Sequence, residues 1–296
     1  MSEIVDAPAP VIAGPTVSTQ WLADHLGSDG LIVLDASVLQ VEGFGGNPAY
    51  VTGHEQYLVH GHIPGAVFAD ILDVFSDPNG RYGFARPNAE QFEAAAASVG
   101  VDDATTVVVY DSSVGLWAAR IWWLLRSFGH DNVAVLDGGL KKWQAEQRVT
   151  ERGHVRPPVA GRFTACERAG FWVEKPDVQA IVAGEAAGSL VCGVPYREFS
   201  GEIAHRARPG HIPGSLSAPA GRLVDRETNT FLPPDALRPI FGDALGGRVV
   251  AYCAGGVAAA ADALALTLIG HDEVSIYDGS LNEWAADSTA PLVVTV

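Results

Sequence analysis

The chain has 296 residues, of which 48% are hydrophobic and 18% charged, and it carries a formal net charge of −16. This length suits two domains of ordinary size, and the apolar content supports sizeable cores and argues against gross disorder. The negative charge argues against nucleic acid or an anionic membrane as a partner, because both attract cationic surfaces. It leaves room for a small anionic substrate, which needs only a local positive pocket.

The cysteines, the histidines and the N-terminus set expectations about compartment and cofactors. Residues 1–15 contain no basic residue and no apolar core of the signal-peptide type, and no window reaches the roughly 18 apolar residues of a membrane span. The three cysteines are too few for a disulfide framework. Histidines and cysteines do not cluster at metal-ligand spacing. We therefore expect a soluble protein of the cytoplasm that uses no metal and no cofactor.

The first half of the chain alternates apolar runs typical of buried strands with helical segments. Ser18 and Thr19 cap a short helix, and Asn88 caps a second helix that Gly100 ends. We predict helices over 20–26, 89–99, 117–128 and 140–147, strands over 31–35, 106–110 and 133–136, and a glycine-rich loop over 42–47. Strands and helices that alternate at this spacing indicate an α/β fold with a mostly parallel sheet covered by helices on both faces.

The order of motifs in the first half repeats in the second. The His-Ile-Pro-Gly element that begins at His62 recurs at His211. The Asp-Gly element at Asp137 recurs at Asp278, and a tryptophan follows each of them. Two such copies indicate a tandem duplication and are too few for a repeat array.

The boundaries of the two copies follow from composition. Residues 1–15 are expected to form a loose arm, because they hold three prolines and few signals of order. Residues 148–162 are rich in arginine, proline and glycine and lack periodicity, which is typical of a linker. We therefore predict one domain over 16–147 and a second over 163–296.

A reactive thiol is predicted at Cys253, where an apolar strand meets an alanine-rich helical segment. Gly255 and Gly256 allow a tight turn and leave backbone N–H groups uncovered. The positive end of the following helix points back at the loop, and helix N-termini lower cysteine pKa values to about 3.5–7.5 in known cases. The alternative is an inert buried cysteine at a strand end. The two glycines and the helix start favour the reactive thiol.

The first copy differs from the second at the matching position. It carries Asp111 there, and a carboxylate cannot serve as a thiol nucleophile. One copy could therefore carry the reaction, while the other shapes a wall of the cleft between them.

These motifs together resemble those of the tandem-domain rhodaneses, the thiosulfate and 3-mercaptopyruvate sulfurtransferases. The resemblance extends from about residue 17 to residue 287 and implies two rhodanese-like domains, the first of them non-catalytic. It also implies that Cys253 takes sulfur from a small anionic donor as a persulfide and passes it to a thiol or cyanide. The backbone N–H groups expected to cradle the terminal sulfur belong to Ala254, Gly255, Gly256, Val257 and Ala258.

The residues after the cysteine bear on the donor. Thiosulfate enzymes of this family typically place arginine and lysine there, whereas this chain has Ala254 and Gly255. Mercaptopyruvate enzymes typically read Cys-Gly-Ser-Gly-Val-Thr, which is closer, although the serine is Gly255 and the threonine is Ala258 here. The resemblance therefore favours 3-mercaptopyruvate as the donor, with thiosulfate:cyanide transfer as the alternative. A further alternative is a non-catalytic persulfide carrier or a degenerate binding protein.

Arginines of the second copy are the candidates for binding the donor. The family usually has an arginine just before the phenylalanine of an Arg-Phe-x-Gly segment; this chain has Glu198 there and Arg197 one place earlier. Arg206 or Arg208 could supply a second family arginine. We expect Arg197 and one of these two to bind a carboxylate or sulfonate, because a guanidinium suits paired oxygens. The alternative is a solvated basic loop.

His62 is a further candidate for the substrate site. The resemblance suggests that the first His-Ile-Pro-Gly histidine faces the catalytic cysteine, and an imidazole there could transfer a proton. The alternative is a structural turn. The copy at His211 supports the turn, since both histidines cannot face one cysteine.

Other residues are interpreted as structural. Cys192, at a strand end in the second copy, is expected to be a buried and inert thiol. Trp117, Trp122 and Trp123 fall at helical spacing and are expected in the core or at the domain interface.

Two remaining expectations concern reaction class and assembly. Cysteine phosphatases can share this fold, but they need an arginine at the end of the cysteine loop, and none lies between Cys253 and Gly270. The acidic composition and the self-contained two-domain architecture favour a monomer.

Overall fold

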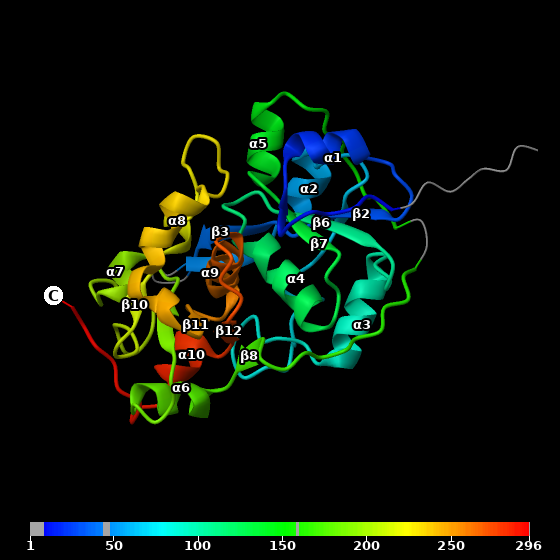
Figure 1. The fold of residues 1–296 in the computed structure, drawn as a ribbon. Helices are drawn as coiled ribbons and strands as arrows, with labels where there is room; N and C mark the ends of the chain where they lie inside the picture. The colour runs from blue at the N-terminus through cyan, green and yellow to red at the C-terminus, as the bar shows by residue number, and fades with distance from the viewer. Residues whose placement is uncertain (1–8, 44–47, 158–159, 296) are drawn as a thin grey trace, which may run out of the picture.

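The computed structural model describes residues 9–43, 48–157 and 160–295. Two halves lie side by side, with helices α4 (Leu116–Ser127) and α9 (Val257–Leu268) where they meet (Figure 1). No helix in the described part of the chain is both long and apolar enough to cross a membrane.

Each half contains a five-stranded sheet in which all neighbouring strands are parallel. The first sheet has the order β1 (Thr16–Val17), β7 (Val133–Leu136), β6 (Thr106–Tyr110), β2 (Leu31–Asp35), β5 (Val67–Phe68). The second has the order β8 (Trp172–Val173), β12 (Val274–Tyr277), β11 (Val249–Tyr252), β9 (Ser189–Cys192), β10 (Leu216–Ser217). The two orders correspond strand by strand, so the predicted duplication and the parallel α/β fold are confirmed.

The predicted helices form close to their expected bounds. The first half contains α1 (Thr19–His25), α2 (His54–His60), α3 (Ala89–Ser98), α4 and α5 (Gly139–Ala145). The second contains α6 (Lys175–Val182), α7 (Tyr196–Phe199), α8 (Pro234–Phe241), α9 and α10 (Ser280–Trp284), with short 3-10 turns at Ala220–Arg222 and Gly242–Gly246. Asn88 caps α3 through a reciprocal pair of hydrogen bonds with Gln91, and the Ser18 hydroxyl accepts the Trp21 N–H at the start of α1.

The hydrophobic core continues from one half into the other. A smaller apolar cluster on one face of the first sheet includes Val33, Tyr110 and Trp143. The larger cluster takes in the other face of that sheet, both central helices and the second sheet, including Trp122 and Leu264. Burial of this continuous apolar surface fixes α4 against α9, and with them the two loops that begin these helices.

The described part of the N-terminal arm is held against the first sheet. The Thr106 hydroxyl donates to the Pro10 carbonyl at 2.8 Å, and the Val135 N–H donates to the Pro15 carbonyl at 2.9 Å. The prediction of a loose arm is therefore wrong for residues 9–15, because the arm continues into β1 and its carbonyls satisfy groups at the sheet edge. Residues 1–8 lie outside the described residues.

A β-hairpin follows β2, where the sequence indicated a glycine-rich loop. Strands β3 (Val38–Glu42) and β4 (Pro48–Thr52) pair antiparallel, and the middle of the predicted loop, 44–47, lies outside the described residues. The described part of the second half has no matching hairpin after β9. The first half therefore supplies an extra wall next to the junction.

Candidate active site

A cavity of about 920 Å³ lies at the junction of the two halves, and Cys253 is part of its wall. Both halves contribute to this wall. The first half supplies, among others, Val38, Tyr50, Phe84, Leu116 and Trp117, and the second supplies Gly193, Val194, Arg197, Glu198, His205 and Ala220. The cavity lies where β9 and β11 end, which is where ligands bind in parallel α/β sheets.

The loop that carries Cys253 is fixed from the side of α10. Cys253 is 2% exposed and directly follows β11. The Leu281 N–H donates to the Cys253 carbonyl at 3.0 Å, and the Asn282 N–H donates to the Ala254 carbonyl at 2.9 Å. A trans peptide directs its C=O and N–H to opposite sides, so these bonds turn the N–H groups of Ala254 and Gly255 away from α10. Within the described residues neither N–H has a protein acceptor.

Ser280 binds the same loop through its side chain. Its hydroxyl accepts the N–H of Cys253 at 3.0 Å and the N–H of Gly256 at 3.1 Å, and it donates to the Tyr277 carbonyl at 2.8 Å. The Gly256 N–H is thus engaged behind the loop. This contradicts the prediction that the Gly256 N–H cradles sulfur, and leaves Ala254, Gly255, Val257 and Ala258 as candidates for the predicted cradle.

The matching loop of the first half already holds an anionic group of its own. The Asp111 side chain is fully buried; one oxygen accepts the N–H of Ser113 and Gly115, and the other accepts those of Trp117 and Ala118, all at 2.8–3.0 Å. Burial raises the pKa of Asp111, and the four N–H donors act against that rise. The loop between β6 and α4 therefore directs four backbone N–H groups at the side chain that follows the strand.

Three aromatic rings form the wall that the first half contributes. They belong to Tyr50 on β4, to Trp117 on α4 and to Phe84, which lies between β5 and α3. The three rings pack edge to face, with ring centroids 5.4–5.7 Å apart. Trp117, Trp122 and Trp123 all belong to the buried core, as expected, and Trp117 also lines the cavity at the junction of the two halves. Only the tertiary fold brings Tyr50 and Phe84 to the site.

The three predicted donor-binding arginines have different environments. Arg197 is on the cavity rim with its side chain 64% exposed, and it pairs with Glu202 at 2.7 Å. Arg206 is largely buried beside the cavity, with its Nε 3.0 Å from the Asn282 Oδ1. Arg208 donates to the backbone carbonyls of residues 287 and 290. The substrate role predicted for Arg208 is contradicted, because its guanidinium ties down the C-terminal segment.

Glu198 lines the cavity and pairs with Arg206. Its side chain is largely buried, 3.3 Å from the Arg206 guanidinium and 3.8 Å from the His205 ring nitrogen. A carboxylate therefore offsets the positive charge of Arg206 at the cavity wall. Burial raises the pKa of Tyr50 across the cavity, and the charge of Glu198 adds to that rise.

His62 is not brought to Cys253. Its ring nitrogens are 3.0 Å from the Tyr57 carbonyl and 3.2 Å from the Glu151 Oε1, and the ring stacks on Tyr57. His211 bonds to the Phe199 carbonyl in the same manner and stacks on that ring. Both histidines stabilise a turn, so the predicted substrate role of His62 is contradicted and the structural alternative holds.

The other described thiols are not equivalent to Cys253. Burial raises the pKa of Cys192 to about 12, which suits the inert thiol that was expected. Cys166 is exposed outside the cavity. In the described part of the chain no three His, Cys, Asp or Glu side chains gather closely enough to hold a metal ion.

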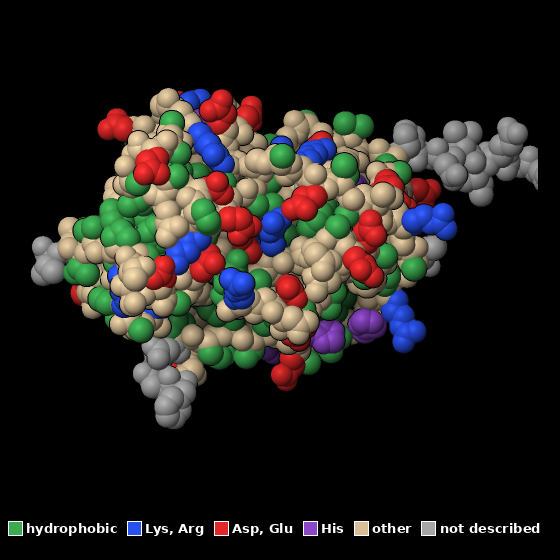
Figure 2. All heavy atoms as spheres, turned by 90° about the horizontal axis from the view of Figure 1, so that it is seen from below, with side chains coloured by type: hydrophobic (Ala, Val, Ile, Leu, Met, Phe, Trp, Pro, Cys, Tyr) green, Lys and Arg blue, Asp and Glu red, His purple; other side chains and the backbone are tan. Residues whose placement is uncertain are grey.

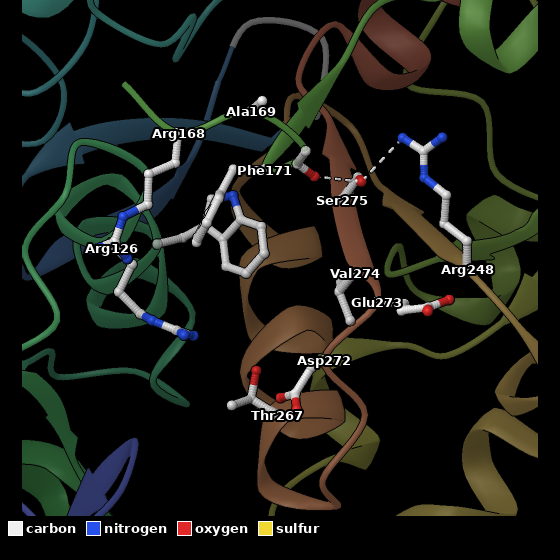
Figure 3. Close-up of a pocket in the computed structure, with 12 residues that line it drawn as sticks. Arg126, Arg168, Ala169, Phe171, Arg248, Thr267, Asp272, Glu273, Val274 and Ser275 are labelled. Carbon is white, nitrogen blue, oxygen red and sulfur yellow. Dashed lines mark hydrogen bonds between the residues drawn. The ribbon is translucent and has the colours of Figure 1, made fainter. Parts of the chain in front are cut away.

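A second cavity, of about 470 Å³, lies at the opposite ends of the strands (Figure 3). Arg126 and Arg168 lie together on one side of it, and Arg248 lies across from them beside Ser275. Arg168 forms two bonds of 2.6 and 2.7 Å with Asp131. No cysteine is among the described residues that line this cavity.

Comparison with known proteins agrees with this geometry. The model of the rhodanese-like domain matches residues 18–146 and 195–287. The 3-mercaptopyruvate sulfurtransferase of Escherichia coli K12 is 33% identical over 281 residues, covering 93% of this chain and 96% of that protein. The thiosulfate/3-mercaptopyruvate sulfurtransferase 2 of Arabidopsis thaliana is 31% identical over 319 residues, covering 94% and 86%. The crystal structure of SseA from Escherichia coli, described as a 3-mercaptopyruvate sulfotransferase, superposes with a TM-score of 0.79 at 31% identity, covering 90% of this chain and 98% of that one.

Proposed function

This chain belongs to the rhodanese-like family and is a sulfurtransferase, and we propose that it moves the sulfur of 3-mercaptopyruvate to an acceptor through a persulfide on Cys253. The observation that carries the proposal is the pair of matching loops. In the first half an Asp111 carboxylate accepts four backbone N–H groups. In the second half, Cys253 takes the place of that carboxylate beside N–H groups that have no acceptor among the described residues.

The first half-reaction transfers sulfur to the protein. The Cys253 thiolate attacks the donor sulfur and a sulfur–sulfur bond forms. The carbon–sulfur bond of the donor breaks, and its electron pair gives the enolate of pyruvate, which takes up a proton and leaves. The N–H groups of Ala254, Gly255, Val257 and Ala258, at the positive end of α9, stabilise the charge on the sulfur.

The second half-reaction returns the protein to its starting state. A thiolate or cyanide attacks the terminal sulfur of the persulfide, and the sulfur–sulfur bond breaks with release of the Cys253 thiolate. A three-carbon donor fills only part of a cavity of about 920 Å³. Room therefore remains for an acceptor larger than cyanide, so a small-molecule thiol is the acceptor that the cavity favours.

Charge at the cavity wall supports the monoanionic donor over thiosulfate. In this proposal Arg206 and Arg197 attract the donor carboxylate. Glu198, 3.3 Å from Arg206, reduces the positive potential, and this reduction penalises a dianion more than a monoanion. Thiosulfate:cyanide transfer is the second candidate, favoured by the name of the Arabidopsis relative, which includes both donors.

The proposal also covers the cellular compartment and the oligomeric state. Its three cysteines are unpaired, which suits a reducing cytoplasm. Acidic and basic side chains are interspersed over the face shown in Figure 2, and we propose a monomer that acts on small molecules. Sedimentation at micromolar concentration is expected to give the mass of one chain.

The mass of the intact protein tests the persulfide. After incubation with 3-mercaptopyruvate and removal of small molecules, the wild type is expected to gain one sulfur atom. Cys253→Ser is expected to gain none, because it lacks the nucleophile. Cys166→Ser is the matched control and should behave as the wild type. A wild-type protein that gains no sulfur from either 3-mercaptopyruvate or thiosulfate would contradict the proposed function.

A further inference from the structure

An arginine of the non-catalytic half lies beneath the catalytic loop of the other half. Arg120 on α4 is 1% exposed. Its Nη1 is 3.4 Å from the Gly256 carbonyl, and its Nη2 is 2.9 Å from the Phe84 carbonyl and 2.7 Å from the Asp278 Oδ1. Its guanidinium also lies over the Trp172 ring at 4.9 Å. A buried charge with this many partners has one defined orientation.

The peptide that Arg120 contacts joins the loop to α9. Gly256 precedes the helix with a φ of 79°. A side chain there would come within 2.6 Å of the Asp278 Oδ1 and 2.9 Å of the Arg120 Nη1, so the ion pair packs directly on this backbone. Because the Gly256 carbonyl faces Arg120, planarity turns the Val257 N–H to the other side of the peptide. Val257 and Cys253 both line the cavity.

The loop of the non-catalytic half lacks this arrangement. Arg120 is the fifth residue of α4, and the fifth residue of α9 is Ala261. Asp137, the counterpart of Asp278, accepts the Phe231 N–H at 2.7 Å. Within the residues that the structure describes, the guanidinium is thus found beneath the loop that carries the thiol and not at the matching position of the other half.

We propose that Arg120 is a positioning residue for sulfur transfer. It fixes the peptide between Gly256 and Val257 so that the N–H groups of the first turn of α9 face the sulfur on Cys253. This inference rests on the proposed persulfide chemistry. If Arg120 has this role, the non-catalytic half contributes to sulfur transfer directly, because one of its residues orients the loop that carries Cys253.

The competing explanation is that Arg120 only holds the two halves together. The variants must therefore remain folded, and the measurements must report on the reactivity of Cys253. A single Arg120→Met change would strand the buried Asp278 carboxylate. The main variant therefore combines Arg120→Met with Asp278→Asn, which removes both charges and keeps an oxygen to accept the Arg86 N–H. Arg120→Lys is the conservative variant, because one ammonium cannot reach both carbonyls and the carboxylate.

The double variant is expected to fold and to lose turnover. Its kcat with 3-mercaptopyruvate should fall about 10- to 100-fold. This is less than the roughly 100- to 1,000-fold seen when an oriented donor is removed outright, because the N–H groups are displaced and not removed. Its KM should change by less than about threefold, because Arg206 and Arg197 are untouched. Alkylation of Cys253 by iodoacetamide should show a midpoint at higher pH than in the wild type. Arg120→Lys should be intermediate in both measurements.

A matched control removes an arginine ion pair that is remote from the loop. Arg168→Met combined with Asp131→Asn removes the pair beside the second cavity and is expected to leave kcat and the alkylation midpoint unchanged. A folded double variant of Arg120 and Asp278 with wild-type kcat and midpoint would overturn the proposal. If that variant does not fold, wild-type values in Arg120→Lys would overturn it equally. The alkylation data remain informative even if the wild type forms no persulfide, so the two proposals fail separately.

Discussion

At the scale of single residues, Glu198 lowers the positive charge beside the cavity. It follows Arg197 in the sequence, yet the two residues have separate roles. Arg197 is exposed and pairs with Glu202, whereas Glu198 is largely buried beside Arg206. Beside the cavity, the charge of Arg206 is therefore largely offset by Glu198, and we expect the strength of donor binding to depend on this offset.

Removing the Glu198 charge should improve binding of anionic donors. In Glu198→Gln the Arg206 guanidinium is no longer paired, so kcat/KM should rise for both donors. The rise should be larger for thiosulfate, by about 3- to 10-fold, the size of a partly exposed charge pair worth roughly 1 kcal/mol. Steady-state assays with both donors measure the ratio. Glu185→Gln, which removes an exposed carboxylate outside the cavity lining, is the matched control. An unchanged donor ratio in Glu198→Gln would contradict this account of selectivity.

At the scale of elements, the strand–loop–helix unit of β11 and α9 depends on α10. Ser280 is fully buried and has a φ of 49°. The matching residue of the first half has a similar φ of 56°, but it is a glycine, Gly139. A serine at this angle is strained relative to glycine. The serine hydroxyl offsets this strain, because it accepts two N–H groups of the loop that carries Cys253.

Ser280→Gly should leave the stability of the fold nearly unchanged while it makes the loop that carries Cys253 less ordered. Relief of backbone strain, about 1 kcal/mol, offsets much of the loss of the hydroxyl's hydrogen bonds, so the midpoint of urea unfolding should change little. The loop loses two anchors, and kcat should fall about 10-fold. Ser280→Ala, which keeps the strain without the hydroxyl, should lose both stability and kcat. Full activity in Ser280→Gly would show that the hydroxyl does not order the loop.

At the scale of the whole molecule, each half covers the loop of the other. The Arg86 N–H of the first half donates to Asp278 at 2.8 Å, and the Phe231 N–H of the second half donates to Asp137 at 2.7 Å. Together with the packing of α4 on α9 (Figure 1), these contacts make the junction one continuous interior. Separation of the halves would therefore expose both loops.

The same interior contains a carboxyl group that has no described partner. Asp262 on α9 is fully buried, neither side-chain oxygen has a hydrogen-bond partner within the described residues, and burial raises its pKa well above the usual value. In the unfolded chain this group ionises near pH 4. In the folded chain it stays protonated to higher pH, so it lowers stability progressively as the pH rises above about 4.

Asp262→Leu should therefore stabilise the protein at high pH. Leucine branches at the same carbon and replaces two unpartnered oxygens with methyl groups. Urea unfolding at pH 8 is expected to show a gain of about 1–3 kcal/mol, and the gain should be smaller at pH 5. Asp262→Asn is the control, which should lose the pH dependence but keep the unpartnered polar atoms. A leucine variant less stable than the wild type at pH 8 would show that the carboxyl has a partner such as a buried water.

The sequence by itself predicted the duplication and most of the elements of the first half, and it pointed to Cys253 as the candidate nucleophile. Apolar periodicity along 106–110 and 249–252, and caps such as Asn88, act within a few residues, so they can be recognised locally. The contrast between Cys253 and Asp111 also needed only the alignment of the two copies.

Only the tertiary structure decided which side chains surround the thiol. Arg206 lies beside the cavity whereas Arg208 binds backbone carbonyls, although they are two positions apart in the same loop. Arg120 and Gly256 are 136 residues apart, and no local pattern links them. Such contacts arise from the packing of α4 on α9, which depends on the shape of both halves together and on burial of their shared core.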